Sequence, residues 1–182
     1  VKDTIIAIAG FIFGPLSAAL VGVVVAAVEM VTISATGPIG LVMNILSSCC
    51  FACVAALIYK RKHTLKGAII GLIVGCLSAT AVMLLWNFLI TPIYMGVPRA
   101  TVAAMLVPVF LPFNLGKYIL NAALTMLIYK PIVTALRKAN LLAPSSSDAA
   151  PVQKKQHLGT ILVSLLILIP CILGFLVWQG VL

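Results

Sequence analysis

Charge is scarce in this sequence. Charged residues make up 8% of the 182 positions and only three residues are acidic, whereas 63% are hydrophobic. A soluble domain is about one-quarter charged. Because a soluble protein must cover its surface with polar groups, this composition excludes an ordinary soluble enzyme, a disordered chain and a disulfide-stapled scaffold. It indicates a protein whose solvent is lipid.

Motifs that carry chemistry are also missing. The phosphate-binding pattern GxxxxGK[ST] does not occur, so we expect no ATP hydrolysis by this chain. Cys49, Cys50 and Cys53 lie in an apolar run without a nearby histidine, and we expect them to act as small apolar residues. No serine shares a membrane depth with a histidine, and the carboxylates are too far apart for paired acid–base work. The sequence predicts neither an enzyme nor a resident cofactor, but a binding unit without its own motor.

Five long runs carry almost no charge. Each is long enough for a helix of about 20 residues that crosses the hydrocarbon core. The runs do not alternate apolar and polar residues as barrel strands would. We therefore predict an all-α, polytopic membrane protein built as a helical bundle. The runs are Thr4–Val28, Met30–Tyr59, Gly67–Pro98, Ala100–Tyr129 and Gln156–Leu182.

The basic residues gather in short clusters between these runs. Four cations lie in Tyr59–Lys66 and five more in Lys130–Lys155. Cytoplasmic loops of membrane proteins are enriched in Lys and Arg, so both segments are predicted to be cytoplasmic. The segment Pro92–Pro112, whose only charge is Arg99, is then external. Such clustering favours a multi-pass protein of the cell membrane over a nucleic-acid-binding protein.

The first run allows two interpretations. A single helix over Thr4–Met30 would be about 40 Å long, which exceeds a hydrocarbon core of about 30 Å. Gly14–Pro15 lies in its middle, where proline removes a backbone donor and kinks a helix. One tilted helix and two short helices both remain possible, and the residues alone slightly favour one helix.

Lys117 is the clearest candidate for a functional residue. It is predicted to lie four residues inside a helix that begins near Phe113, and it shares one face with Asn114, Asn121 and Thr125. A polar stripe that faced lipid would leave several groups unsatisfied, so the stripe should face protein or ligand. A snorkelling lysine and hydrogen bonding between helices are the alternatives to a ligand cavity.

A proline-rich external segment precedes this helix. The residues TPIYMGVPR, Thr91–Arg99, predict a rigid non-helical loop, and VPVFLP, Val107–Pro112, predicts a second bend. Tyr94 and Met95 offer flat or adaptable apolar groups at the membrane surface.

We expect these elements to form a lid over a pocket lined by Asn87, Asn114 and Lys117. Such a pocket suits a neutral, partly aromatic ligand with many hydrogen-bonding groups. Trp86 either contributes to it or belongs to the interfacial aromatic belt.

Two further features concern packing and the membrane surface. Glu29 is interpreted as an interfacial carboxylate, and Asn44 is a weaker polar signal in the next span. Small residues at a spacing of four let helices approach closely, either inside the protein or against a membrane partner, and internal packing is favoured. These residues are Ala18, Gly22 and Ala26, and Gly67, Gly71 and Gly75.

Four segments together resemble a known family. They are FIFGPLSAALVG, TGPIGLVMNILSS, LLWNFLITPIYMGVPR and LPFNLGKYILNAALTMLIYK. They are similar to the riboflavin-specific S component of energy-coupling-factor (ECF) transporters, over about Asp3 to Lys138. The resemblance implies a six-helix vitamin-binding subunit that partners with a transmembrane coupling protein and two cytoplasmic ATPases. It implies that residues matching Asn87, Asn114 and Lys117 bind the flavin and that external loops close over it.

The resemblance also implies an organisation for the chain. The family places Lys2 outside and splits the first run at Gly14–Pro15, so we expect helices at about 4–14, 15–31, 38–59, 66–91 and 113–136 in a membrane domain of residues 1–138. In the family another helix, which docks the coupling protein, precedes the segment matching Lys2–Gly14, and we expect it to be lacking here. Residues 139–157 are expected to form a cytoplasmic linker, and residues 158–182 an additional transmembrane helix without an assigned role.

The expected function is capture of riboflavin, or a close flavin, from outside the cell and its delivery through an ATPase-driven coupling module. The alternatives are an S component for another vitamin and a structural membrane protein without transport activity. The candidate substrate-binding residues are Trp86, Asn87, Tyr94, Met95, Asn114, Lys117 and Asn121.

Overall fold

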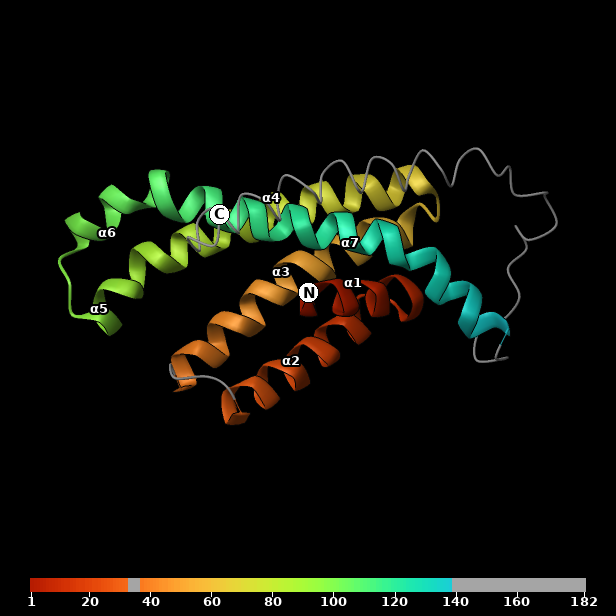
Figure 1. Cartoon of the computed structure of the whole chain (residues 1–182), viewed down its shortest axis with the longest axis horizontal. Helices are drawn as coiled ribbons and strands as arrows, with labels where there is room; N and C mark the ends of the chain where they lie inside the picture. The colour runs from red at the N-terminus through yellow and green to blue at the C-terminus, as the bar shows by residue number, and fades with distance from the viewer. Residues whose placement is uncertain (33–36, 139–182) are drawn as a thin grey trace, which may run out of the picture. The chain divides into compact units, whose positions relative to one another are not determined.

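The computed structural model of the chain describes residues 1–32 and 37–138, and no strand occurs among them. The predicted all-α class is confirmed. The helices are α1 (Lys2–Phe13), α2 (Pro15–Thr32), α3 (Gly37–Arg61), α4 (Leu65–Leu89), α5 (Thr91–Met95), α6 (Arg99–Met105), the π-helix η1 (Leu106–Phe110) and α7 (Leu111–Lys138), as Figure 1 shows.

The chain forms two compact units, Val1–Ala122 and Ala123–Leu182, and the boundary between them falls within α7. The sequence had placed a domain boundary after Lys138. The predicted linker, 139–157, and the predicted additional span, 158–182, lie outside the described residues.

Among residues 1–32 and 37–138, four helical stretches are long and apolar enough to cross a membrane: Pro15–Thr32, Gly37–Arg61, Leu65–Leu89 and Arg99–Thr134. Helix α1 has 12 residues, which is about 18 Å at 1.5 Å per residue and too short to cross unaided.

Side-chain size distinguishes the two faces of α2. Leu16, Leu20 and Val24 are more than half exposed. Ala18, Gly22 and Ala26 are the buried residues of the helix. Large side chains therefore face outward, as expected of a helix whose outer face contacts lipid, while small ones face the protein. This confirms internal packing for the Ala18–Gly22–Ala26 stripe.

The first apolar run is broken at Gly14. Its φ of 98° lies in a region that side chains disfavour, and Pro15 then begins α2, where its missing N–H is not needed. The single-helix interpretation is therefore wrong, and the split implied by the family resemblance is confirmed. Helices α1 and α2 pack against each other and both pack against α3 (Figure 1).

Two glycines allow α4 to approach α3 closely. A Cβ atom at Gly71 would lie 2.7 Å from the Ala55 carbonyl oxygen, and one at Gly75 would lie 2.5 Å from the Phe51 carbonyl oxygen. Both oxygens belong to a helix backbone, which cannot move aside easily. We call these four residues the glycine seam. The seam confirms that the predicted stripe of Gly67, Gly71 and Gly75 serves internal packing.

The external segment differs from the prediction. Thr91–Met95 is helix α5, with Pro92 in its first turn, and Gly96, at a φ of 65°, ends it. The predicted bend at Val107–Pro112 instead continues the helix as η1 and the start of α7. The non-helical loop was wrong because proline is tolerated in a first turn and a π-helical turn accommodates an interrupted bond pattern. Residues 91–112 are therefore mainly helical.

Candidate functional site

Lys117 lies well inside a long helical stretch. Helix α7 begins at Leu111, and α6 and η1 continue the helical chain on its amino-terminal side. A snorkelling lysine would extend toward the aqueous interface, whereas the Lys117 ammonium group is directed toward polar groups of α1 and α3.

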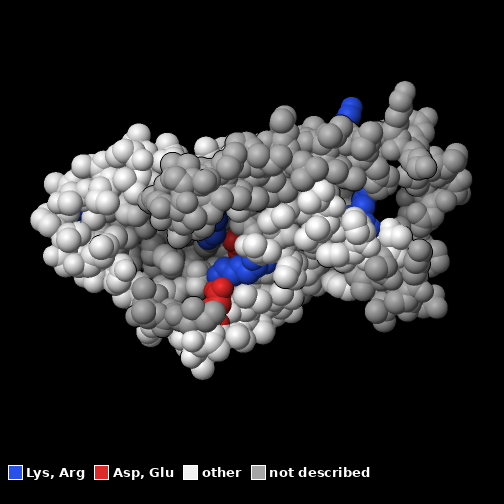
Figure 2. All heavy atoms as spheres, in the orientation of Figure 1, with Lys and Arg blue, Asp and Glu red and all other residues white. Residues whose placement is uncertain are grey.

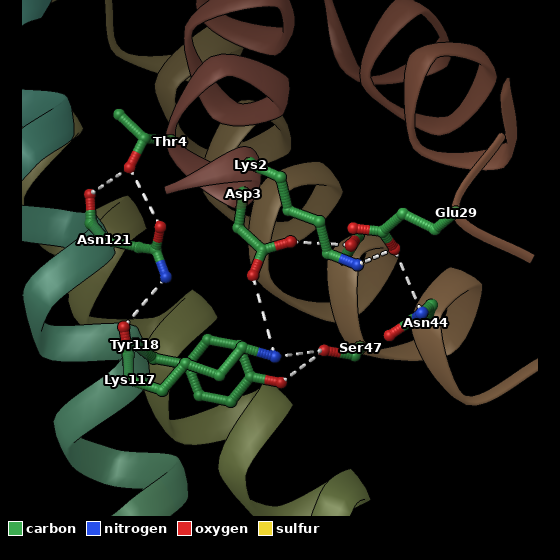
Figure 3. A network of polar contacts seen from close by, with 10 residues as sticks. Lys2, Asp3, Thr4, Glu29, Asn44, Ser47, Lys117, Tyr118 and Asn121 are labelled. Carbon is green, nitrogen blue, oxygen red and sulfur yellow. Dashed lines mark hydrogen bonds and ion pairs between the residues drawn. The ribbon is translucent and has the colours of Figure 1, made fainter. Parts of the chain in front are cut away.

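The Lys117 ammonium group lies beside Ser47 and Asp3. Nζ donates a hydrogen bond of 3.2 Å to Ser47 Oγ and lies 3.8 Å from Asp3 Oδ2 (Figure 3). Asp3 Oδ1 in turn accepts a hydrogen bond of 2.6 Å from Ser48 Oγ. The side chain of Asp3 is 1% exposed and that of Lys117 is 32% exposed. The lysine thus lies between a buried carboxylate and accessible space.

Tyr118 contacts Ser47 and lies beside Lys117. Its hydroxyl group and Ser47 Oγ are 2.7 Å apart, and its ring stacks on Phe51 with centroids 5.5 Å apart. The Lys117 Nζ atom lies 5.0 Å from the centre of the Tyr118 ring, within range of a cation–π interaction. Ser47 is therefore shared by the lysine and the tyrosine, which limits the freedom of both side chains.

A second ion pair lies beside the first. Lys2 of α1 pairs with Glu29 of α2, and Asn44 Nδ2 of α3 donates a hydrogen bond of 3.0 Å to Glu29 Oε2 (Figure 3). The interpretation of Glu29 as an interfacial carboxylate did not anticipate these partners. We call Lys2, Asp3, Glu29 and Lys117 the ion cluster.

The sequence reasoning missed Asp3 altogether. The composition contained a usable signal: the chain has only three acidic residues, and Asp3 and Glu29 directly border the predicted apolar runs. Intramembrane carboxylates are rare and usually pair with a cation. Figure 2 shows the result, a place where basic and acidic atoms meet on a face that otherwise shows little charge.

Asn121 connects α7 to α1. Thr4 Oγ1 donates a hydrogen bond of 2.9 Å to Asn121 Oδ1, and Asn121 Nδ2 donates one of 2.8 Å to the Lys117 carbonyl oxygen. Asn121 is 2% exposed. For this residue the geometry favours hydrogen bonding between helices over ligand contact. Thr125, on the same predicted stripe, belongs to the second unit.

Asn87 and Asn114 hydrogen-bond locally. Asn114 Nδ2 donates to the Phe110 carbonyl oxygen at 2.8 Å, and Asn87 Oδ1 accepts from Thr91 Oγ1 at 3.1 Å. Within the described residues, no hydrogen bond joins either asparagine to Lys117. Each amide has more donors and acceptors than the one bond uses, so both retain capacity for a ligand.

The apolar candidates lie around α5. Trp86, near the end of α4, is partly exposed. Tyr94 and Met95 are 50% and 56% exposed. The structure therefore brings Lys117 and Asn121 into one polar network, but no hydrogen bond, ion pair or ring contact in the described part of the chain joins Trp86, Tyr94 or Met95 to it.

Comparisons with known proteins agree with this architecture. Residues 2–129 match the family described as the substrate-specific component of ECF transporters. The riboflavin transporter RibU of Staphylococcus aureus (strain TCH60) is 30% identical over 140 residues, which cover 72% of each chain. A solved structure described as the S component of a bacterial ECF transporter superposes with a TM-score of 0.62 at 27% identity, covering 74% of this chain and 77% of that one.

Proposed function

Since this chain belongs to the substrate-specific components of ECF transporters, we propose that it captures riboflavin, or a close flavin, and presents it for transport. The observation that carries the choice of ligand is the similarity to a riboflavin transporter, 30% identity over 140 residues. The family match, over residues 2–129, includes the whole candidate site.

The chemistry of the site is consistent with a flavin. The ring system is an apolar slab whose carbonyl and ribityl groups need donors and acceptors. Asn87, Asn114 and Lys117 retain hydrogen-bonding capacity, and Trp86 and Tyr94 supply aromatic surface. In this proposal Asn121 holds α1 against α7 and supports the site from behind.

The partners follow from the family. This chain lacks a phosphate-binding motif for ATP, so ATP hydrolysis is assigned to two cytoplasmic ATPases, which act through a transmembrane coupling protein. Helix α3 ends at Lys60 and Arg61, and more cations follow before α4. This positive segment supports a cytoplasmic location for that end, and the family supports assignment of the protein to the cell membrane. The site then opens toward the outside.

The test is a titration of the purified, ligand-free protein with riboflavin, followed by quenching of flavin fluorescence. We expect saturable binding with one ligand per chain. Asn114→Leu should weaken binding, and Ile73→Ala, on the exposed face of α4, should leave the affinity unchanged. Absence of saturable quenching by the wild-type protein would contradict riboflavin as the ligand. Equal affinity of Asn114→Leu and the wild type would remove Asn114 from the site.

A further inference from the structure

The ion cluster is balanced in charge. It contains two lysines and two carboxylates, joined pairwise as Lys2–Glu29 and Lys117–Asp3. The whole chain carries 12 basic and three acidic residues, so chance pairing would leave most lysines without an acid. Two of the three acids nevertheless lie beside these two lysines.

Asp3 is too deep to touch a ligand. Its side chain is 1% exposed, and its Oδ2 atom is buried and has no hydrogen-bond partner in the described residues. Ser48 holds the other oxygen. A buried oxygen without a hydrogen-bond partner affects its surroundings through its negative charge. The cation beside it is the Lys117 ammonium group, at 3.8 Å. Asp3 can therefore influence a ligand only through Lys117 and through its electrostatic field.

That field affects the choice of ligand. An unneutralised lysine in a medium of low dielectric constant would attract phosphate strongly. With Asp3 beside it, Lys117 still donates hydrogen bonds to a neutral carbonyl or hydroxyl group, but the site offers no net positive charge to a phosphate. An anionic ligand would meet an ion cluster in which the two carboxylates offset the two lysines.

We infer that Asp3 determines specificity: by neutralising Lys117 it makes the site select an uncharged flavin over its phosphorylated form. This inference rests on the proposed function. Asp3 is a positioning residue, because it acts on the ligand through Lys117 rather than by contact.

The test is a charge series with two probes, riboflavin and riboflavin 5′-phosphate, each titrated by fluorescence quenching at low ionic strength. The variants are Asp3→Asn, Lys117→Gln and the double variant, which change the net charge of the ion cluster by +1, −1 and 0. The quantity measured is the ratio of the phosphate's Kd to that of riboflavin. A purely structural role for Asp3 would change both Kd values together and leave the ratio constant.

The ratio should follow the charge. One unit charge within about 10 Å of a phosphate, at an effective dielectric constant of about 20, changes the ratio by at least about tenfold. Asp3→Asn should therefore lower the ratio by at least about tenfold, Lys117→Gln should raise it, and the double variant should return it to the wild-type value. Ser48→Ala, which removes a bond to Asp3 without changing charge, should leave the ratio unchanged.

The outcomes separate the two proposals. If the wild-type protein binds neither probe, the proposed function fails. If it binds riboflavin and the ratio stays constant across the series, the function stands and the role of Asp3 is refuted. Should Asp3→Asn not fold, the comparison of Lys117→Gln with the double variant still decides. A higher ratio in the single variant supports the inference, and equal ratios refute it.

Discussion

The glycine seam and the ion cluster hold the same helix, α3, by opposite means. At the seam α3 meets α4 through backbone contact, where Gly71 and Gly75 face carbonyl oxygens. At the cluster it meets α1 and α7 through hydrogen bonds, in which Ser48 donates to Asp3 and Ser47 accepts from Lys117. In lipid the hydrophobic effect does not drive helices together, so close packing and polar contacts must stabilise their association.

The glycine seam and the ion cluster differ in whether their side chains are accessible to a ligand. The seam has no spare volume and no polar side chain, so it can serve only stability. The cluster contains groups that remain partly accessible, including a lysine that is 32% exposed. Intramembrane charges are costly and are retained mainly where they have a role. Substitutions in the two regions should therefore affect different measurements.

The largest effect is expected at the seam. Gly75→Leu should abolish the folded protein, because even a Cβ atom would lie 2.5 Å from the Phe51 carbonyl oxygen. Overpacking a helix contact costs about 1–3 kcal/mol for a few methylene groups and more when backbone must move. The measurement is the monodisperse fraction in size-exclusion chromatography.

Gly22→Ala is the matched control for the seam. A Cβ atom there would meet its nearest neighbours at 3.8 to 3.9 Å, which is ordinary contact. Its melting temperature should equal or slightly exceed that of the wild type, because alanine favours a helix by up to about 1 kcal/mol over glycine. A folded Gly75→Leu protein with wild-type stability would contradict the claim that close α3–α4 packing requires glycine at this position.

Next in size is the effect of Lys117→Ala on binding. Hydrogen bonds from a charged group contribute about 1.5–3 kcal/mol, so the riboflavin Kd should rise by one to two orders of magnitude. Fluorescence titration of the folded fraction measures it. An unchanged Kd would remove Lys117 from the ligand site and leave the ion cluster a purely structural feature.

Substitution of Asn121, near the ion cluster, should separate an effect on stability from an effect on riboflavin binding. Asn121→Leu loses the bond to Thr4 and should lower the free energy of unfolding by about 1 kcal/mol, with the riboflavin Kd nearly unchanged. Thr4→Val should lose the same bond, and the double variant should be little worse than either single one. A large loss of affinity in Asn121→Leu alone would instead make Asn121 a ligand residue.

The smallest effect is expected for Tyr118→Phe. The variant loses the hydrogen bond to Ser47 but keeps the ring that stacks on Phe51. A single hydrogen bond contributes about 0.5–1.5 kcal/mol, so thermal unfolding in detergent should shift by only a few degrees. A loss as large as that of Gly75→Leu would show that the polar corner matters as much as the seam.

The sequence predicted the helices well and the polar contacts poorly. The long helices begin and end within about two residues of the predicted ranges, because twenty apolar residues in lipid have few alternatives to a helix. The break at Gly14 needed the family resemblance, since a proline permits both a kink and a new helix.

Side-chain pairing depends on which helix faces which, and that information is not local. Asp3 and Lys117 lie at opposite ends of the first unit's sequence, and no periodicity connects them. Asn87 and Asn114 were predicted as ligand residues, and that assignment remains a prediction. The external segment was misjudged because proline content suggested loops where first-turn and π-helical geometry accommodate it.

Capture of riboflavin by this chain is tested by the absorption spectrum of the protein purified, without added ligand, from cells grown with riboflavin. We predict a yellow protein with flavin bands in nearly equimolar amount, lost on exhaustive dialysis and restored by riboflavin. A colourless protein that is folded and takes up no flavin would show that the chain does not capture riboflavin.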